Sequence, residues 1–424
     1  MTPWEIRQFR RQSLLRPAAP AMLRHMQIAR AVLVLNALCC CHGIVAADAN
    51  DALRVDAAFP GGNIVVEAIE GDTVALHQDL RDTRDHWFYW CFRVQGAAGR
   101  TLDFKFTRGN VIGVRGPAVS TDHGRTWRWL GAAAVSDSTF RFNFPGHAQE
   151  ARFCMTIPYL EANLRQFLAR YRDSPGLRAD VLCKTKKGRE VELLHLGRLD
   201  GQCRFRVLLA ARHHACETMA SYGLEGILES VLADTDEGRW FRQQVEFLVV
   251  PFMDKDGVEE GDQGKGRQPR DHNEDYAGES SHASVRALRD LVPRWSQGRL
   301  RLALDMHCPS IRGGWHEQIY FVCRRENAWP EVQHFSAILK AVQTGPLRFN
   351  LNATDSNAKW RTSPDSDSAK FAGWAGRLPG VRLATTIEIP YANAGGGEVT
   401  AETARALGRD VARAVRRFLE SGVM

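Results

Sequence analysis

The sequence predicts an α/β domain with a mixed, twisted sheet and helices on both faces, preceded by a small all-β sandwich domain. Short runs that alternate apolar and polar residues fill residues 54–155, and this pattern is typical of a sandwich. From about residue 160, apolar strand candidates alternate with helix candidates, which predicts layers of helices around a sheet. At 424 residues the chain is long enough to bury more than one core.

Residues 1–47 have the pattern of a secretory signal. Arg24 and Arg30 precede an apolar run over 31–38, and the segment ends in the small residues Ala46 and Ala47. We therefore expect cleavage near Ala47 and export, to the periplasm or the medium; without a signal the protein would be cytoplasmic. The apolar run is too short for a stable membrane span, so none is expected in the mature chain.

Residues 48–158 are predicted to form the sandwich domain. Two segments place phenylalanines and a leucine at every second position, as one buried face of a strand requires; they are Leu102, Phe104 and Phe106, and Phe140, Phe142 and Phe144. The aromatic run 86–92 predicts a further strand, buried on both faces. We interpret these aromatic side chains as core residues rather than as a sugar-binding surface.

Residues 159–424 are predicted to form the α/β domain. A linking helix is expected over 160–171. The apolar runs predict strands over 191–196, 205–211, 245–252, 300–307, 319–322 and 381–389. Helical spacing predicts helices over 218–232, 283–291, 332–342 and 402–420, the last with a strongly apolar face.

Charge and cysteine content bear on possible partners and on disulfide pairing. The formal charge is +7, but residues 1–47 carry six arginines and one glutamate, so only +2 belongs to the remainder. Because no basic cluster stands out there, we do not expect a nucleic-acid partner. Seven of the ten cysteines follow residue 47. An odd number cannot pair completely within one chain, and the sequence does not determine which of these cysteines pair.

Potential metal ligands follow the ends of predicted strands. His214 and Glu217 come after the apolar run 207–211, and His307 ends the run 302–307. Imidazole nitrogen and carboxylate oxygen are ligands that zinc accepts, and sites in such sheets collect at the carboxyl ends of strands. Glu388 ends a third buried strand, where a carboxylate without a partner would be costly. The four residues together predict a zinc site with a free carboxylate.

Four motifs in this order resemble the metallocarboxypeptidases of the carboxypeptidase A type, in particular the cytosolic carboxypeptidase-like branch with an amino-terminal β-sandwich. The motifs are Arg-His-His-Ala-Cys-Glu-Thr-Met-Ala at 212–220, Val-Val-Pro-Phe-Met-Asp-Lys-Asp-Gly at 249–257, Asp-Met-His-Cys-Pro at 305–309 and Thr-Ile-Glu-Ile-Pro at 386–390. The resemblance implies a hydrolase that holds one Zn²⁺ per chain through His214, Glu217 and His307. It further implies that Glu388 is the general base for a water attacking a peptide or peptide-like substrate.

One segment departs from the family pattern. At 270–276 the resemblance leads us to expect an Asn-Arg pair whose arginine clamps the substrate's terminal carboxylate, but Glu274 follows Asn273. Asn273 is kept as a predicted substrate contact, and Glu274 could instead receive an amino group of an unusual substrate. Lys265, Arg267 or Arg270 could replace the missing clamp. Arg267 is also the candidate for stabilising the oxyanion.

Three functions therefore remain open from the sequence. The first is a metallocarboxypeptidase that hydrolyses a carboxyl-terminal peptide or isopeptide bond. The second is a zinc amidase or deacylase on the same scaffold, which needs no terminal-carboxylate clamp. The third is a catalytically weak relative that binds peptides or cell-wall fragments. The residue released, the natural substrate and the oligomeric state are not determined by the sequence.

Overall fold

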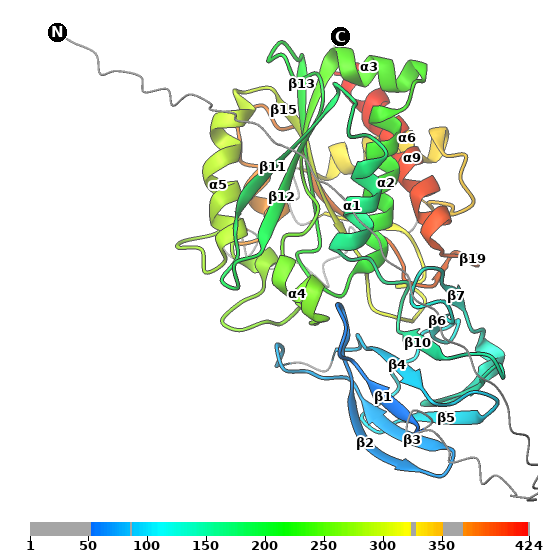
Figure 1. Ribbon diagram of the computed structural model, residues 1–424. Coiled ribbons are helices and arrows are strands. Elements are labelled where there is room, and N and C mark those ends of the chain that lie inside the picture. The colour runs from blue at the N-terminus through cyan, green and yellow to red at the C-terminus, as the bar shows by residue number, and fades with distance from the viewer. Residues whose placement is uncertain (1–51, 85–86, 324–327, 351–367, 423–424) are drawn as a thin grey trace, which may run out of the picture. The chain divides into compact units, whose positions relative to one another are not determined.

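The computed structural model describes residues 52–84, 87–323, 328–350 and 368–422, which all belong to one structural unit spanning Asp48–Met424 (Figure 1). The predicted signal at 1–47 lies outside the described residues. Among the helices that the structure describes, none has the length and apolar character needed to cross a membrane.

The amino-terminal part of this unit is β-rich, as predicted, and contains two five-stranded sheets. One sheet has the order β1 (Arg54–Asp56), β4 (Cys91–Gln95), β10 (Glu150–Cys154), β6 (Ala118–Ser120) and β7 (Arg128–Trp129). The other has the order β2 (Val65–Glu70), β3 (Thr73–His77), β5 (Thr101–Phe106), β9 (Thr139–Asn143) and β8 (Val135–Ser136), with a short 3-10 turn at Ala132–Ala134. The alternating phenylalanines fill the core, where the rings of Phe104 and Phe140 stack with their centroids 4.8 Å apart.

The strand expected over the aromatic run 86–92 begins later than predicted. Ladder pairing begins only at Cys91, and the described residues before it are not in a strand, although Phe88, Tyr89 and Trp90 are buried. Their polar groups bond elsewhere: the Tyr89 backbone N–H donates to Gln263 Oε1 at 2.8 Å, and its hydroxyl donates to the Gly61 carbonyl at 2.9 Å. The partner Gln263 belongs to the following domain, so a long-range contact replaces the strand pairing.

The second part is built on a seven-stranded mixed sheet. Its order is β11 (Leu177–Lys184), β12 (Glu190–Gly197), β14 (Val245–Val250), β13 (Phe205–Ala211), β15 (Leu300–His307), β17 (Leu383–Glu388) and β16 (Tyr320–Val322). The four central strands β14, β13, β15 and β17 are parallel to one another, while β11, β12 and β16 pair antiparallel with their neighbours. A separate hairpin joins β18 (Asn393–Ala394) and β19 (Gly397–Glu398).

Helices cover both faces of this sheet, which confirms the predicted α/β class (Figure 1). They are α1 (Glu161–Ala169), α2 (Thr218–Leu232), α3 (Asp236–Gln244), α4 (Lys255–Glu260), α5 (Ala283–Ser296), α6 (Trp329–Val342), α8 (Phe371–Ala375) and α9 (Ala401–Glu420), with a 3-10 turn at His272–Glu274. Alternate residues of β13 face opposite cores: Val207 and Leu209 pack with α2 and α9, whereas Leu208 and Ala210 pack with α5 and α8. The strand is therefore apolar throughout because both of its faces are buried.

Several boundaries differ from the expected ranges. The helix expected over 283–291 continues through Pro293 to Ser296, and β11 and α3 were not expected. Most β11 residues are exposed or half-exposed on an edge strand, and α3 is polar overall, so neither carries a strong apolar signal. The last helix begins at Ala401 because the Thr400 hydroxyl caps it by accepting from the Thr403 N–H.

Candidate metal and catalytic site

Three parallel strands deliver the site residues to one edge of the sheet. His214 follows the end of β13 at Ala211, while His307 and Glu388 are the last residues of β15 and β17. His307 and Glu388 are direct register partners across these two strands. Glu217 stands at the N-cap of α2, one turn after His214. The strand ends and the helix start therefore place all four side chains together.

Two imidazoles and one carboxylate converge on a common point. His214 Nδ1 lies 2.7 Å from Glu217 Oε1, His307 Nδ1 lies 2.8 Å from Glu217 Oε2, and the two Nδ1 atoms are 3.1 Å apart. All three residues are buried. Their potential ligand atoms, one from each residue, lie within 4.8 Å of one another. Two nitrogens and one carboxylate oxygen suit a three-ligand zinc site with a position left open.

The outward nitrogen of each ligand histidine faces another carboxylate. His307 Nε2 is 2.6 Å from Asp305 Oδ2, and His214 Nε2 is 3.5 Å from Asp271 Oδ2. Carboxylates in this position fix the orientation of a metal-binding imidazole and direct the lone pair of its other nitrogen inward. The donor set and its support therefore fit zinc at the inward Nδ1 atoms.

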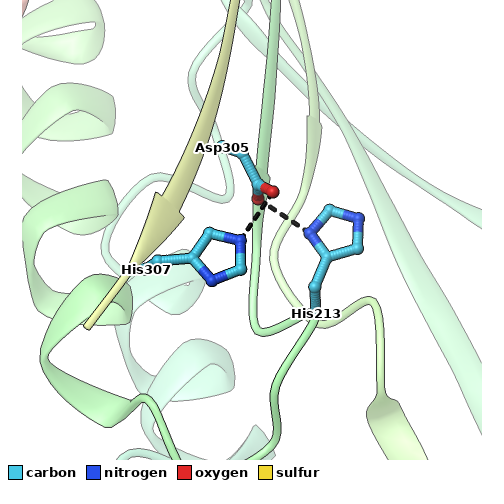
Figure 2. Close-up of side chains that lie close together, drawn as sticks. All are labelled: His213, Asp305 and His307. Carbon is cyan, nitrogen blue, oxygen red and sulfur yellow. Dashed lines mark hydrogen bonds and ion pairs between the residues drawn. The ribbon is translucent and has the colours of Figure 1, made fainter. Parts of the chain in front are cut away.

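Asp305 also joins a second polar group, shown in Figure 2. Its Oδ1 is 2.7 Å from His213 Nδ1, and His213 Nε2 is 2.8 Å from the Tyr276 hydroxyl. His213, Asp305 and His307 have metal-ligand chemistry as well. Because the nitrogens and oxygens of this group are already hydrogen-bonded to one another and to Tyr276, we interpret it as the support of His307 rather than as a second ion site.

The charges of these residues shift one another's pKa values. Burial opposes protonation of His307, but Asp305 and Glu217 outweigh it and raise the pKa of this histidine well above its ordinary value. Burial raises the pKa of Glu217, but His214 and His307 together bring it well below the usual range for a glutamate. The pocket therefore favours positive charge beside the Glu217 carboxylate, which is the preference that a bound cation satisfies.

Glu388 faces this group from the next strand. Burial raises the pKa of its carboxyl group, Glu217 raises it further, and His307 and Lys265 oppose the increase. Its Oε2 is shielded from solvent and has no hydrogen-bond partner among the described residues. A carboxylate oxygen left without a partner beside the ligand group is available to a water molecule or a substrate.

Lys265 supplies positive charge next to the site. Burial opposes its charged form, but attraction from Glu217, Glu388 and Asp271 raises its pKa. Its ammonium nitrogen lies 5.0 Å from the ring centre of Trp87, a residue of the amino-terminal domain. That domain therefore provides part of the wall around this cation.

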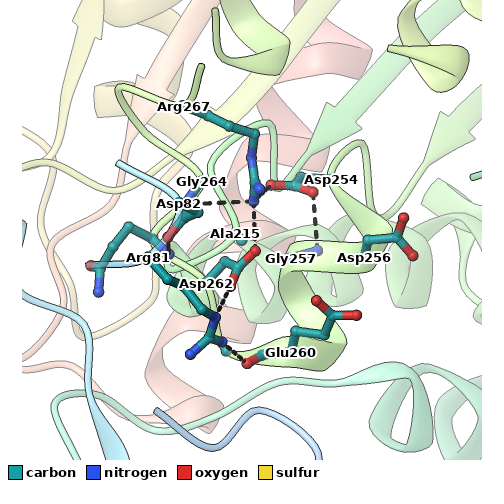
Figure 3. A network of polar contacts seen from close by, with 12 residues as sticks. Arg81, Asp82, Ala215, Asp254, Asp256, Gly257, Glu260, Asp262, Gly264 and Arg267 are labelled. Carbon is teal, nitrogen blue, oxygen red and sulfur yellow. Dashed lines mark hydrogen bonds and ion pairs between the residues drawn. The ribbon is translucent and has the colours of Figure 1, made fainter. Parts of the chain in front are cut away.

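Arg267 lies in a different set of contacts, shown in Figure 3. Its Nη2 is 2.6 Å from Asp254 Oδ2 and 3.1 Å from Asp262 Oδ2, and it also approaches Asp82 Oδ2 at 3.4 Å. Burial opposes the charge, but these carboxylates raise the pKa of Arg267 above its already high value. Nη2 of the guanidinium is thus engaged in ion pairs, while Nε is buried without a hydrogen-bond partner among the described residues.

The segment predicted to bind substrate forms a short turn beside the ligand group. Asn273 Nδ2 lies 3.5 Å from His307 Nε2, whereas Arg270 is held within its own loop by Asp275, 3.0 Å away, and by the Glu279 carbonyl. The Glu274 carboxylate is half exposed and contacts Lys370. Asn273 therefore lies next to His307, while Arg270 forms an ion pair with Asp275.

The sequence predicts the proposed ligand group, but it does not indicate the residues that contact the outward nitrogens. Asp271 and Asp305 were visible next to the ligand residues, but nothing in the sequence assigned them to the outward nitrogens. No motif contains Lys370, so sequence patterns do not single it out. Cys216 and Cys308, each next to a proposed ligand residue, are buried, and burial raises the pKa of the Cys216 thiol to about 12.

Comparison with known proteins points in one direction. Residues 164–278 match the zinc carboxypeptidase family. An uncharacterised protein of Zymomonas mobilis is 29% identical over 215 residues, which cover 48% of this chain and 54% of that protein. Cytosolic carboxypeptidase 3 of Mus musculus is 30% identical over 179 residues, 40% of this chain and 18% of that protein. The chain thus spans about half of the first curated relative and less of the second.

Solved structures show the same fold over most of the chain. A metallo-carboxypeptidase from Burkholderia cenocepacia has a TM-score of 0.72 and 19% identity, covering 88% of this chain and 100% of its own. A metallo-carboxypeptidase from Pseudomonas aeruginosa, in complex with (2-guanidinoethylmercapto)succinic acid, has a TM-score of 0.72 and 21% identity, covering 87% and 99%. The fold is a carboxypeptidase fold, and residues 164–278 resemble the zinc carboxypeptidases in sequence.

Proposed function

We propose that this chain, which resembles the zinc carboxypeptidases in sequence and fold, is a zinc-dependent metallocarboxypeptidase. It would hydrolyse a carboxyl-terminal peptide or isopeptide bond. The observation that carries the proposal is the convergence of His214 Nδ1, His307 Nδ1 and the Glu217 carboxylate, with Glu388 opposite His307 in register. The family match ends at residue 278, so the motifs around His307 and Glu388 and their geometry support the assignment of these two residues.

His214, Glu217 and His307 would hold one zinc ion per chain. A zinc ion bound there supplies a Lewis acid, which polarises a carbonyl and makes water a nucleophile near neutral pH. Asp271 and Asp305 keep the two imidazoles in the orientation that such binding needs.

Glu388 is the proposed general base. Its unpartnered Oε2 accepts the proton of the attacking water, and the same carboxyl group returns that proton to the leaving amine. Burial raises its pKa, so its affinity for the proton is greater than that of an exposed glutamate. The residue is thereby suited to both halves of the transfer.

The carbonyl oxygen gains negative charge during the attack and needs a positive neighbour. Arg267 was the candidate from the sequence, but it is engaged by Asp254, Asp262 and Asp82. Lys265 is attracted by both Glu217 and Glu388, whereas the charges that act on Arg267 are those of Asp254, Asp82 and Asp262. We therefore assign the oxyanion to Lys265 and give Arg267 the role of holding its loop.

The test combines metal analysis with hydrolysis. We expect about one zinc per chain and release of the last residue from an amino-blocked peptide. His214→Ala and His307→Ala should each lose both properties, because a three-ligand site needs every ligand. Unchanged zinc content in both variants would contradict the metal assignment, and a zinc-loaded protein that hydrolyses no peptide would contradict the activity.

Glu274 supports a second candidate, a zinc amidase or deacylase. Its half-exposed carboxylate occupies the position where the resemblance leads us to expect an arginine. An enzyme with no need for a free terminal carboxylate would hydrolyse an amidated peptide as well as the free acid. Comparing these two peptides separates the candidates.

We also propose that the protein is exported after cleavage near Ala47. The basic and apolar pattern of residues 1–47 supports this, although it lies outside the described residues. Amino-terminal sequencing of the protein from its native host should find a start close to Asp48. Retention of Met1 would contradict export by this route.

A further inference from the structure

A carboxypeptidase must recognise a carboxylate that lies next to the bond it breaks. The scissile carbonyl and the terminal carboxylate are separated only by the nitrogen and Cα of one residue. A group that binds this carboxylate must therefore stand close to the metal ligands and carry positive charge. The position expected to supply it holds Glu274, so the cation must come from elsewhere in the chain.

Lys370 is a cation next to Glu274, and no sequence motif contains it. Its ammonium nitrogen lies 2.6 Å from Glu274 Oε1, across 96 residues of sequence. The Lys370 side chain is only 14% exposed, whereas Glu274 is 50% exposed. The pair therefore presents a nearly buried ammonium group beside a carboxylate that reaches solvent.

The backbone around Lys370 is held against the substrate-side turn. Asn273 Oδ1 accepts a hydrogen bond from the Phe371 N–H at 3.1 Å, and the Ala369 carbonyl accepts one from the Tyr276 N–H at 2.8 Å. The Phe371 ring is fully buried and lies 5.4 Å from the ring of His213. Lys370 is thus fixed between two anchored residues.

Those anchors also connect Lys370 to the metal group. Asn273, which binds the backbone beside Lys370, directs its amide nitrogen to within 3.5 Å of His307 Nε2. Asp271, which contacts His214, accepts a hydrogen bond from the Glu274 N–H at 3.1 Å. Lys370 is therefore linked to both histidines, through Asn273 on one side and through Glu274 and Asp271 on the other.

The other cations near the site have different partners. Arg267 is engaged by three carboxylates, and Arg270 is paired with Asp275. Lys265 interacts with Glu217 and Glu388, on the side where the bond is broken. An ammonium group has three donors, and the Glu274 contact uses one of them.

We propose that Lys370 binds the terminal carboxylate of the substrate in place of the missing arginine. This inference rests on the proposed peptidase function and names its specificity-determining residue. Glu274 holds the ammonium group in position through the 2.6 Å contact. Because an ammonium is a point charge and lacks the planar fork of a guanidinium, it fixes the direction of the carboxylate less strictly.

The test uses a pair of amino-blocked peptides, one with a free terminal carboxylate and one with a terminal amide. The last residue is the one that the unmodified protein hydrolyses or binds best among a varied set. Two quantities are measured for each peptide: kcat/KM in the active protein, and Kd by calorimetry in the zinc-loaded Glu388→Gln background. The second readout does not depend on catalysis.

We expect Lys370→Met to weaken binding of the free-carboxylate peptide by roughly ten- to a hundredfold, the usual range for losing a hydrogen bond to a charged group. Binding of the amidated peptide should change little, and zinc content should be unchanged. Lys370→Arg should restore the preference for the free acid. Lys370→Gln, which keeps a donor for Glu274, should fold if the methionine variant does not and should show the same loss.

Lys340→Met is the matched control, because it removes an exposed lysine from α6 in the same domain. It should alter neither peptide's binding. Equal affinity of the Lys370 variants and the parent for the free-carboxylate peptide would overturn the inference, and so would a parent protein that does not prefer the free acid. Lys370-dependent binding without any hydrolysis would uphold the inference and overturn the proposed activity instead.

Discussion

In His214 and His307, the proposed ligand histidines, the two ring nitrogens have the same kinds of contact. Nδ1 points to the ligand group, and Nε2 points to a carboxylate, Asp305 for His307 and Asp271 for His214. The two contacts differ in length, 2.6 Å and 3.5 Å, so Asp305 is the stronger constraint. Its second oxygen is held by His213, which fixes the carboxylate in turn.

Asp305→Asn should therefore weaken zinc binding while leaving all three ligands in place. We expect affinity to fall by roughly 10- to 100-fold, the usual effect of removing a partner that orients a metal ligand. Competition with a chelator of known affinity measures this. Asp290→Asn, at an exposed position of α5, is the control and should bind zinc normally. Equal affinities would mean that Asp305 does not orient His307.

Glu388→Gln should separate metal binding from catalysis. The amide cannot accept a proton from water, so hydrolysis should fall by roughly 10²–10⁴. Zinc content and thermal stability should remain close to those of the parent, because Glu388 is not among the three ligands. Near-normal turnover at full zinc occupancy would assign the base to another residue.

At the scale of elements, α2 and α9 approach each other so closely that glycine is required between them. A Cβ on Gly226 would lie 2.0 Å from the Arg405 carbonyl oxygen, and one on Gly408 would lie 2.0 Å from the Gly223 carbonyl oxygen. The obstacle is backbone on both sides, so it cannot move aside as a flexible side chain can. This contact seats α2, whose N-cap is Glu217.

Gly226→Ala should destabilise the protein even though alanine favours a helix by about 1 kcal/mol over glycine. Overpacking against the α9 backbone should outweigh that gain, with a net loss on the order of 1–3 kcal/mol. Thermal unfolding measures the difference. Gly146→Ala, where an added Cβ meets nothing within 4 Å, should leave the Tm within error. A more stable Gly226→Ala protein would show that the helices separate easily.

At the scale of the whole described unit, ion pairs connect the β-rich amino-terminal part to the part built on the seven-stranded sheet. Arg81 Nε is 2.9 Å from Asp262 Oδ1, and Asp82 reaches Arg267 (Figure 3). Asp262 is crowded by burial and by Asp82, which together raise its pKa to about 6. The arginines offset this repulsion, so the network depends on their charge.

Arg267→Met should leave Asp82, Asp254 and Asp262 without their shared cation. Removing one member of a largely buried ionic network typically costs about 3–5 kcal/mol, and we expect a loss near the lower end because Arg267 is 18% exposed. Denaturant unfolding at pH 7 tests this. Arg141→Met breaks the exposed pair with Asp103 and should leave the free energy of unfolding nearly unchanged. Similar losses in both variants would mean that the network contributes little to stability.

The sequence by itself determined the α/β class, the β-rich start and the set of ligand types at strand ends. Strands such as Phe205–Ala211 are continuous apolar runs because both faces are buried, and local patterning reveals that without further information. His214 with Glu217 is a local motif as well, since a strand end and a helix start place them together. The cleavage site near Ala47 and the division at residue 158 remain predictions.

Only the tertiary structure decided which charges meet. Arg267 pairs with Asp82 from the β-rich part of the chain, and this contact argues against an oxyanion role. Glu274 pairs with Lys370, which is 96 residues away in the sequence. Electrostatic contacts depend on distances of a few ångströms, whereas sequence patterns report burial and periodicity along the chain. A charged residue at the surface of a loop looks the same in sequence whether it faces water or an opposite charge, so its function is decided by the folded arrangement.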